Sequence, residues 1–269
     1  MDETPAIDGS VDALTRAIEG NAAELLLAMG AAGGGRQRSA DGVRWTIGGS
    51  PLDYHNAVVD CSVDDGAADQ VVAESLQELK DHGVPGSWHV GPSMRPLDLG
   101  DRLLTAGFRH GGAEPGMALR LTELREAEAA GLRVERIGLA ELGVWADTLG
   151  RGFGEGPKEA QWVAQVYRRL GVADPWRHYL GYLDGEPVAT ATVFLAAGVA
   201  GVYFVMTVPE ARRRGIGAAL TSAALREARD SGSQYAVLGS SPAGRSVYER
   251  LGFREFCSIN LYELALPQE

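Results

Sequence analysis

The most constraining feature of this chain is an apolar run that passes through a glycine- and arginine-rich turn into a helix-forming segment, at residues 205–220. Pro209 has no N–H with which to continue a strand ladder, and Gly215 and Gly217 carry no Cβ to block a close ligand. The sequence after Gly217 strongly favours a helix. The free N–H groups of a first helical turn favour anions, and the arginines at 212–214 add positive charge. The turn is therefore typical of a phosphate-binding loop.

The spacing of the glycines separates three kinds of phosphate loop. A P-loop ends in Gly-Lys-Ser/Thr, which is missing here, and a dinucleotide fingerprint has a third glycine where Leu220 stands. The spacing Arg212-x-x-Gly215-x-Gly217 resembles the Gln/Arg-x-x-Gly-x-Gly/Ala signature of the GNAT acetyltransferase superfamily, whose loop holds the pyrophosphate of acetyl-coenzyme A. An ordinary glycine-bearing turn between a strand and a helix is the alternative explanation.

A second motif follows at the spacing found in that family. A strand at 234–238 leads into a helix that reads Tyr-x-x-x-Gly-Phe from Tyr248 to Phe253, and a last strand follows. In the GNAT family this tyrosine is offered to the departing coenzyme A sulfur, so the resemblance implies that Tyr248 is catalytic. With a reference pKa of about 10, a tyrosine is protonated at neutral pH and can donate to sulfur. A packing tyrosine before a Gly252 C-cap is the alternative.

The resemblance also implies which residues bind the coenzyme. In the family the first strand of the motif splays away from its neighbour, and its backbone binds the pantetheine arm and the acetyl oxygen. The residues expected to bind acetyl-coenzyme A are Phe204, Met206, Thr207, Val208, Arg212, Arg213, Arg214, Gly215, Ile216, Gly217, Ala218, Ser241 and Ser246. No metal is expected.

The substrate contacts and the general base are harder to place. The acceptor pocket of the family is lined by two early helices and the loop between them, here residues 150–157. Phe153 and Glu155 in that loop, together with His178, are candidates for substrate contact. Residues 201–208 contain no carboxylate, so the cofactor strand supplies no base. Four residues remain candidates for the general base, namely Glu155, Glu159, Asp174 and His178. Each of them can also be explained as a solvated or packing residue.

Two domains of related plan are predicted. A complete GNAT-like unit spans residues 131–269, and residues 1–122 resemble a second copy in which residues 101–108 mirror the tyrosine helix. Leu103 stands in place of the tyrosine, and carboxylates in a turn at 64–69 replace the arginines, so this copy would repel a pyrophosphate. We expect an α/β (α+β) fold of two GNAT-like domains, the first degenerate, each with a mixed, mostly antiparallel central sheet flanked by helices. Chance similarity of two α/β halves is the alternative.

Composition narrows the class of protein without identifying it. The formal charge of −11 over 269 residues argues against a nucleic-acid partner, since such proteins usually present a basic face. Residues 188–208 are uncharged over a length that could span a membrane, but their strand-forming residues and a turn at 198–201 favour two buried strands. The acidic N-terminus does not resemble a signal peptide. No membrane segment and a cytoplasmic location are expected.

The expected function is acetyl-coenzyme A-dependent transfer of an acetyl group to a primary amine of a small molecule, by direct attack on the thioester. Three alternatives stay open: a module that binds acyl-coenzyme A without turnover, a tandem enzyme with another acyl donor, and a protein amine as acceptor. A sensor would be expected to lose Tyr248, which this chain retains. A homodimer is compatible with the sequence.

Overall fold

The computed structural model describes residues 7–265, which form two halves of similar plan. The elements of the N-terminal half are α1 (Val11–Gly33), β1 (Arg36–Ala40), β2 (Val43–Ile47), η1 (Asp53–His55), β3 (Ala57–Cys61), α2 (Asp65–His82), β4 (Gly86–Val90), α3 (Leu99–Thr105) and β5 (Arg109–Arg120). Those that follow are η2 (Leu121–Glu123), β6 (Leu132–Arg136), η3 (Leu139–Glu141), α4 (Leu142–Gly150), α5 (Pro157–Leu170), β7 (Trp176–Leu183), β8 (Glu186–Ala196), β9 (Val199–Thr207), η4 (Pro209–Ala211), α6 (Ile216–Asp230), β10 (Tyr235–Gly239), α7 (Arg245–Leu251) and β11 (Arg254–Leu264).

The two halves repeat one pattern of strand pairing. Strands β1, β2 and β3 pair antiparallel, and β3 then pairs parallel with β4 across helix α2. Strands β7, β8 and β9 do the same, and β9 pairs parallel with β10 across helix α6. A shift of register, the mark of a β-bulge, interrupts both the β2–β3 and the β8–β9 pairing. The plan that the sequence predicts for both halves is thus visible in their topology.

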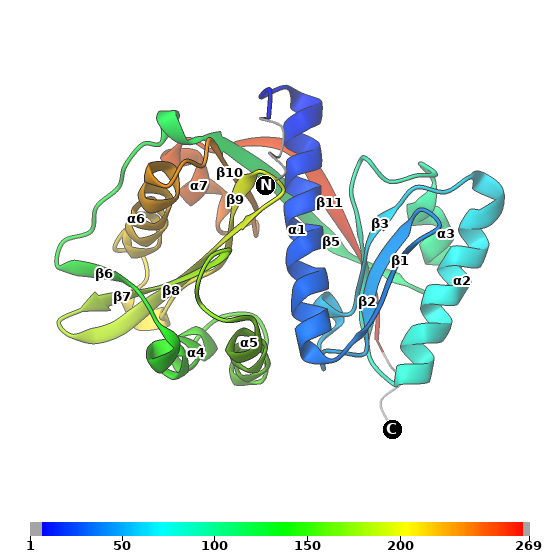
Figure 1. Cartoon of the computed structure of the whole chain (residues 1–269), viewed down its shortest axis with the longest axis horizontal. Helices are drawn as coiled ribbons and strands as arrows, with labels where there is room; N and C mark the ends of the chain where they lie inside the picture. The colour runs from blue at the N-terminus through cyan, green and yellow to red at the C-terminus, as the bar shows by residue number, and fades with distance from the viewer. Residues whose placement is uncertain (1–6, 266–269) are drawn as a thin grey trace.

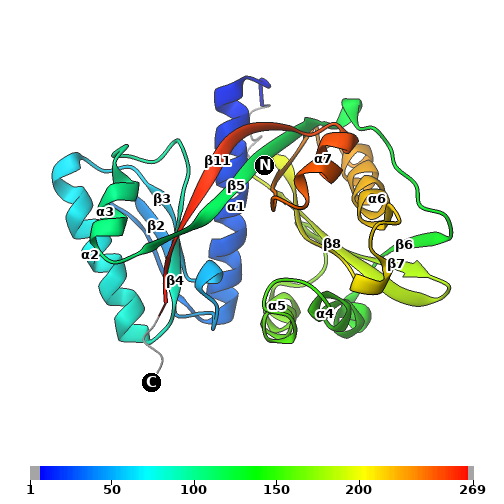
Figure 2. The same cartoon turned by 180° about the vertical axis from the view of Figure 1, so that it is seen from behind.

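The two halves exchange their last strands. Strand β5 pairs with β10 of the other half, β11 pairs with β4, and β5 and β11 pair with each other. The result is one mixed sheet of eleven strands in the order β1-β2-β3-β4-β11-β5-β10-β9-β8-β7-β6, where the sequence predicted a sheet for each half. Figures 1 and 2 show β5 and β11 crossing between the halves. Each exchanged strand covers an edge that would otherwise expose a row of unpaired N–H and C=O groups.

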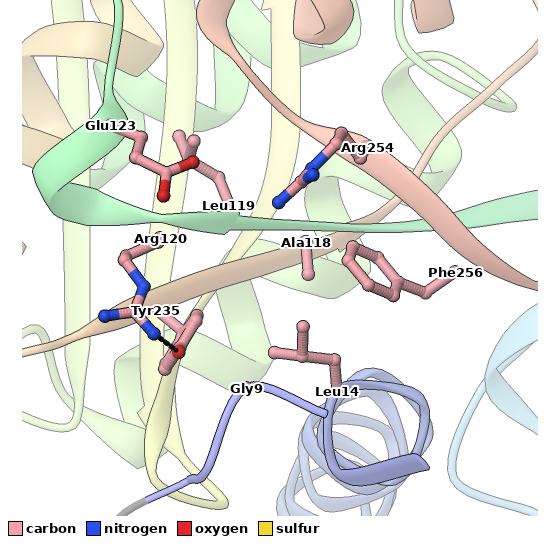
Figure 3. Close-up of a pocket in the computed structure, with 9 residues that line it drawn as sticks. All are labelled: Gly9, Leu14, Ala118, Leu119, Arg120, Glu123, Tyr235, Arg254 and Phe256. Carbon is pink, nitrogen blue, oxygen red and sulfur yellow. Dashed lines mark hydrogen bonds between the residues drawn. The ribbon is translucent and has the colours of Figure 1, made fainter. Parts of the chain in front are cut away.

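A shallow pocket of about 280 Å³ lies where the exchanged strands meet helix α1. Arg120 at the end of β5 donates a hydrogen bond of 2.6 Å to the hydroxyl of Tyr235 at the start of β10. Figure 3 shows this pair together with Leu14 of α1 and Phe256 of β11. The pair joins the exchanged strand to its host at the outer end of their ladder.

Cutting the chain between its halves is expected to prevent folding. A fragment of residues 131–269 lacks β5 beside β10 and β4 beside β11, so two strand edges lose their partners. We expect this fragment to aggregate and to show no cooperative melting by circular dichroism, whereas co-expression with residues 1–122 restores a folded complex. A sharp melting transition of the fragment alone would show that each half folds by itself. The two ranges stay predictions as domain boundaries.

Helix α1, which the sequence analysis did not anticipate, packs between the two halves (Figure 1). It begins at Ser10, whose side chain accepts a hydrogen bond from the N–H of Ala13, and ends at Gly34, which takes a left-handed φ of 93°. Midway along it, fully buried Asn21 donates to the carbonyls of Phe194 and Ala196 and accepts from the Tyr203 hydroxyl. The helix is thereby joined to the β8–β9 hairpin.

Two local expectations are corrected. The predicted turn at 64–69 is the first turn of helix α2, for which Asp64 is the N-cap. The uncharged stretch 188–208 forms β8 and β9 as expected, but the chain reverses at residues 197–198, and residues 199–201 already belong to β9. None of the helices in the described part of the chain is long and apolar enough to cross a membrane.

Candidate active site

The parallel strands β9 and β10 separate towards their carboxyl ends. Within the described chain they pair only at Ala200 with Ala236 and at Gly201 with Val237. The separation coincides with the β8–β9 bulge, where Phe204 takes a φ of 50°, a costly conformation for a bulky residue. The Phe204 carbonyl accepts a hydrogen bond of 2.8 Å from the Thr190 hydroxyl, which holds this conformation. The fold therefore maintains an opening beside β9.

Helix α6 begins at this opening with a row of unpaired N–H groups. Its N-cap is Gly215, at a left-handed φ of 75°, and no side chain caps the helix. Among residues 7–265, no backbone carbonyl accepts from the N–H groups of residues 215–218. Such a helix start favours an anion. Gly217 contributes open space, since a Cβ there would meet only the Thr207 hydroxyl, at 3.4 Å.

The three arginines of the turn have different environments. Arg212 donates to the carbonyl of Thr207 at 3.0 Å and to that of Gly152 at 3.2 Å, so its guanidinium braces the turn against β9 and the α4–α5 loop. Arg213 and Arg214 are exposed, and Arg213 takes a left-handed φ of 62°. These two remain available to an anion at the start of α6.

A cavity of about 360 Å³ adjoins the opening and lies between the two halves. Helix α1, the η1 segment and β5 line it from the N-terminal half, and the α4–α5 loop, β9 and Tyr248 line it from the other. Its described lining residues include no lysine or arginine, but they include four acidic residues, namely Asp53, Glu114, Glu155 and Glu159. A cation therefore matches the charge of the cavity better than an anion does.

Tyr248 lies in helix α7, and its side chain lines the cavity. Its ring packs edge-on against Phe253, with the ring centroids 5.8 Å apart. Burial raises the pKa of Tyr248 to about 12. The hydroxyl is therefore protonated at neutral pH and can donate a proton towards a ligand.

A buried hydrogen-bonding pair of side chains, His55 and Glu159, joins the two halves beside the cavity. His55 Nε2 and Glu159 Oε1 lie 3.3 Å apart, while the other oxygen of Glu159 accepts a hydrogen bond of 3.0 Å from the Glu155 N–H. Burial tends to raise the pKa of Glu159, but the hydrogen bonds and the charge of His55 outweigh it and lower that pKa overall. One oxygen of Glu159 therefore contacts the η1 segment and the other the α4–α5 loop.

Glu114, another acidic residue of the cavity, has a different hydrogen-bond partner from Glu159. The Tyr54 hydroxyl donates to Glu114 Oε2 at 3.2 Å, and burial raises the pKa of this carboxyl. Tyr54, His55 and Glu114 are not among the residues that the sequence predicts for the site, because all three lie in the half that lacks the phosphate loop. No local motif marks them, and only the strand exchange brings Glu114 to the cavity.

The predicted site residues are mostly brought together. Of the expected coenzyme and substrate contacts, those that line the cavity are Phe153, Glu155, Phe204, Ser241 and Tyr248. Met206, Thr207 and Val208 follow along β9 and just beyond it, and residues 215–218 begin α6. Ser246 is exposed on α7.

Two of the candidate residues lie away from the cavity. His178 is fully buried, its Nδ1 lies 2.8 Å from the Thr192 hydroxyl, and its ring packs on Tyr167 with the centroids 4.1 Å apart. Burial lowers the pKa of His178 to about 3, so the ring is neutral. Asp174 pairs with Arg177 and Arg136, and the Arg177 hydrogen bond lowers the pKa of that carboxyl to about 2. The structure gives neither residue a contact with the cavity.

In the N-terminal half, Arg95 lies at the position beside β3 that corresponds to this opening. Arg95 donates its N–H to the Cys61 carbonyl at 2.8 Å, and it forms an isolated parallel bridge with Ser62, so the chain fills the space beside β3. The first turn of α2 carries Asp65, and Asp69 in the next turn pairs with Arg102. Both features disfavour a bound pyrophosphate in this half.

Fold and site together define an acetyltransferase-like α/β protein, and a family model supports this for the C-terminal part. Residues 144–253 match the model described as the Acetyltransferase (GNAT) family. This segment of the chain is a GNAT domain, and it contains the β9–β10 opening, the start of α6 and Tyr248. No curated protein matches the chain.

Several solved structures share the fold of both halves. A GCN5-related N-acetyltransferase from Kribbella flavida is 20% identical over 91% of this chain and 96% of its own, with a TM-score of 0.72. A functionally unknown conserved protein from Staphylococcus epidermidis is 13% identical over 85% and 93%, with a TM-score of 0.67. A tandem GNAT protein from the clavulanic acid biosynthesis pathway is 15% identical over 84% and 79%, with a TM-score of 0.61. At these identities the likeness concerns the fold alone.

Proposed function

We propose that the protein transfers an acetyl group from acetyl-coenzyme A to the primary amine of a small molecule. The observation that carries this proposal is the meeting of two features at one place. An anion-favouring helix start adjoins the β9–β10 opening, and the cavity beside it is acidic and is lined by Tyr248. The helix start would bind a pyrophosphate, and the acidic cavity would bind an amine next to the thioester.

The residues present fit the coenzyme. The N–H groups of residues 215–218, with Arg213 and Arg214, would hold its pyrophosphate, and Arg212 would keep the turn in place. The backbone of β9 beyond Gly201 does not pair with β10 in the described chain, so it is available to the pantetheine arm. Bound acetyl-coenzyme A would supply the activated acetyl group, while Tyr248 would donate a proton to the departing sulfur.

The dimensions and charge of the cavity favour a small cationic acceptor. A volume of about 360 Å³ accommodates a drug-sized molecule, which binding pockets of about 300–1,000 Å³ typically hold. Its walls come from both halves of one chain, so a folded protein surface would have little access to it. A protein amine, another acyl donor and binding without turnover remain the other candidate functions.

The direct test is release of free thiol from acetyl-coenzyme A in the presence of a panel of primary amines. We expect at least one small cationic amine to raise the rate well above background hydrolysis. If acetyl-coenzyme A binds but no amine raises thiol release, the result favours a sensor that binds acyl-coenzyme A without turnover. If acetyl-coenzyme A does not bind at all, the proposal fails.

Replacing Tyr248 by phenylalanine is expected to lower kcat by about 10–100-fold, because the thiolate then leaves without a proton donor. The effect stays below complete loss, since a thiolate is already a fair leaving group. The KM for acetyl-coenzyme A should change little, because the ring and its packing on Phe253 are retained. Steady-state kinetics of thiol release measure both constants. Tyr182→Phe, a matched change outside the cavity, should leave them unaltered, and an unaltered kcat in Tyr248→Phe would contradict the role of this hydroxyl.

A further inference from the structure

The strand exchange places one carboxylate of the N-terminal half beside the end of β10. Gly116 of β5 pairs with Gly239 of β10, and the carbonyl of Pro115 accepts a hydrogen bond of 2.9 Å from Ser240. Glu114 follows along the same edge, and a Cβ on Gly239 would lie only 3.0 Å from its Oε2 atom. Glycine at position 239 therefore leaves room for this carboxylate at the mouth of the β9–β10 opening.

Glu114 and Asp53 are the acidic residues of the cavity with the fewest partners among the described residues. Asp53 accepts at Oδ1 from the Tyr54 N–H at 2.7 Å, and of the two only Glu114 lies beside Gly239 at the strand exchange. Glu159 uses both oxygens, for His55 and for the Glu155 N–H. Glu155 is half exposed and paired with Lys158 at 3.1 Å. Glu114 engages only Oε2, through the Tyr54 hydroxyl, and no partner for its Oε1 is present among the described residues. One oxygen of Glu114 thus remains for a ligand.

The surroundings of Glu114 also suit proton transfer. It lines the acceptor cavity and also a second cavity of about 350 Å³, which both halves line and which shares Tyr54 and Tyr203 with the first. Burial raises the pKa of Glu114, which brings its basicity closer to that of an amine. A proton taken from a ligand in the first cavity can therefore leave through the second. Besides Tyr54, Tyr203 and Glu114, the charged and titratable residues that line the second cavity are Arg16, Glu19, Arg44, Asp60 and His89.

We propose that Glu114 binds the ammonium group of the acceptor and removes a proton from it, and that Tyr54 positions the carboxylate. This inference rests on the proposed acetyl transfer. The catalytic carboxylate of the C-terminal GNAT domain is then supplied by the half that has lost its own coenzyme site.

The reacting groups are the ammonium group of the acceptor and the thioester of acetyl-coenzyme A. One ammonium proton passes to Glu114 and onward to water, and the freed nitrogen pair forms the C–N bond to the acetyl carbon. The C–S bond breaks, and its electron pair stays on sulfur, which takes a proton from the Tyr248 hydroxyl. A second nitrogen proton replaces the one that Tyr248 gave, and the third stays on the amide.

Three groups that face Glu114 from its neighbours, Tyr54, Tyr203 and His89, do not exchange protons with it near neutral pH. Burial raises the pKa of Tyr54 and of Tyr203, so both hydroxyls keep their protons. Burial lowers the pKa of His89 to about 3, so that ring stays neutral. The remaining neighbours are the His55–Glu159 pair in the acceptor cavity and the charged residues of the second cavity. Because a protonated carboxyl does not attract a cation, amine affinity should fall on acidification, at a higher pH than for an ordinary glutamate.

The test compares a cation with its neutral isostere in the full-length protein. We would titrate 2-phenylethylamine and 2-phenylethanol into the wild type and Glu114→Gln, each with coenzyme A present, by calorimetry. The inference predicts that the wild type prefers the amine, that Glu114→Gln weakens amine binding at least about tenfold, and that alcohol binding is unchanged. Tyr54→Phe should give a smaller loss, because it removes only the hydrogen bond to Oε2.

The controls separate this inference from the function on which it rests. Acetyl-coenzyme A affinity should be equal in the wild type and Glu114→Gln, which also shows that the variant folds. Glu186→Gln, the same change of charge at an exposed position outside the cavity, should leave amine binding intact. Unchanged amine affinity in Glu114→Gln, or a wild type that binds the alcohol as tightly as the amine, would overturn the inference without touching the coenzyme site. Failure of the wild type to bind acetyl-coenzyme A would instead refute the proposed function.

Discussion

Gly217→Trp is expected to weaken the binding of acetyl-coenzyme A by at least about 100-fold, a loss of about 2.7 kcal/mol. The side chain would cover the N–H groups at the start of α6, which are proposed to hold the pyrophosphate. The fold itself should tolerate the change, because a Cβ at this position makes only an ordinary contact with the Thr207 hydroxyl. Calorimetric titration of wild type and variant measures the difference.

The chain offers a matched control for this change. Gly66 is the second residue of α2, just as Gly217 is the second residue of α6, and a Cβ on Gly66 meets nothing within 4 Å. Gly66→Trp should bind acetyl-coenzyme A as the wild type does, because the N-terminal half has no open coenzyme site. Equal affinities of wild type and Gly217→Trp would show that the coenzyme does not use this helix start.

Asn21→Ala is expected to lower the free energy of unfolding by about 2–4 kcal/mol. The change removes three hydrogen bonds, those that Asn21 donates to the carbonyls of Phe194 and Ala196 and the one it accepts from the Tyr203 hydroxyl. Each buried group left unsatisfied costs about 1–3 kcal/mol, offset in part by local rearrangement. Urea unfolding followed by circular dichroism measures the loss.

Tyr203→Phe is the milder comparison for this network. It removes one hydrogen bond and keeps the ring, so we expect a loss of about 1 kcal/mol. If Asn21→Ala cost no more than Tyr203→Phe, helix α1 would not be held to the β8–β9 hairpin by this residue. The junction between the halves would then depend on apolar packing and on the exchanged strands alone.

The elements around the phosphate loop could be predicted because their signals are local. A run of helix-forming residues after a glycine turn gives α6, and Gly252 with its φ of 105° ends α7 where the sequence places a C-cap. The uncharged stretch 188–208 was correctly assigned to strands, because β-forming residues and a glycine turn occur within it. The reversal falls at 197–198 because Ala197 and Gly198 both take a left-handed φ.

The strand exchange and the acceptor side of the site could not be predicted in the same way. Whether β5 pairs with β4 or with β10 depends on contacts between residues more than a hundred positions apart, such as Met117 with Leu238. Glu114 and His55 acquire their surroundings only through that arrangement. His178 shows the reverse case, since its residue type suggests chemistry while the fold buries it against Tyr167. Local patterns therefore indicate the coenzyme loop better than the acceptor pocket.

The degenerate half is an integral part of the proposed enzyme. It supplies a strand to the C-terminal sheet, the helix between the halves, and Tyr54, His55 and Glu114 at the cavity. Loss of its own phosphate loop is compatible with this role, because Arg95 lies beside β3 and leaves the opening beside β9 unaffected.

The most direct test of this account is the stoichiometry of acetyl-coenzyme A binding to the full-length protein, measured by isothermal titration. We expect a single site per chain, because Arg95 and the aspartates at the start of α2 disfavour a pyrophosphate in the N-terminal half, whereas β9 and β10 separate beside the start of α6. Absence of binding would contradict the proposed coenzyme, and two sites per chain would contradict the loss of the site in the N-terminal half.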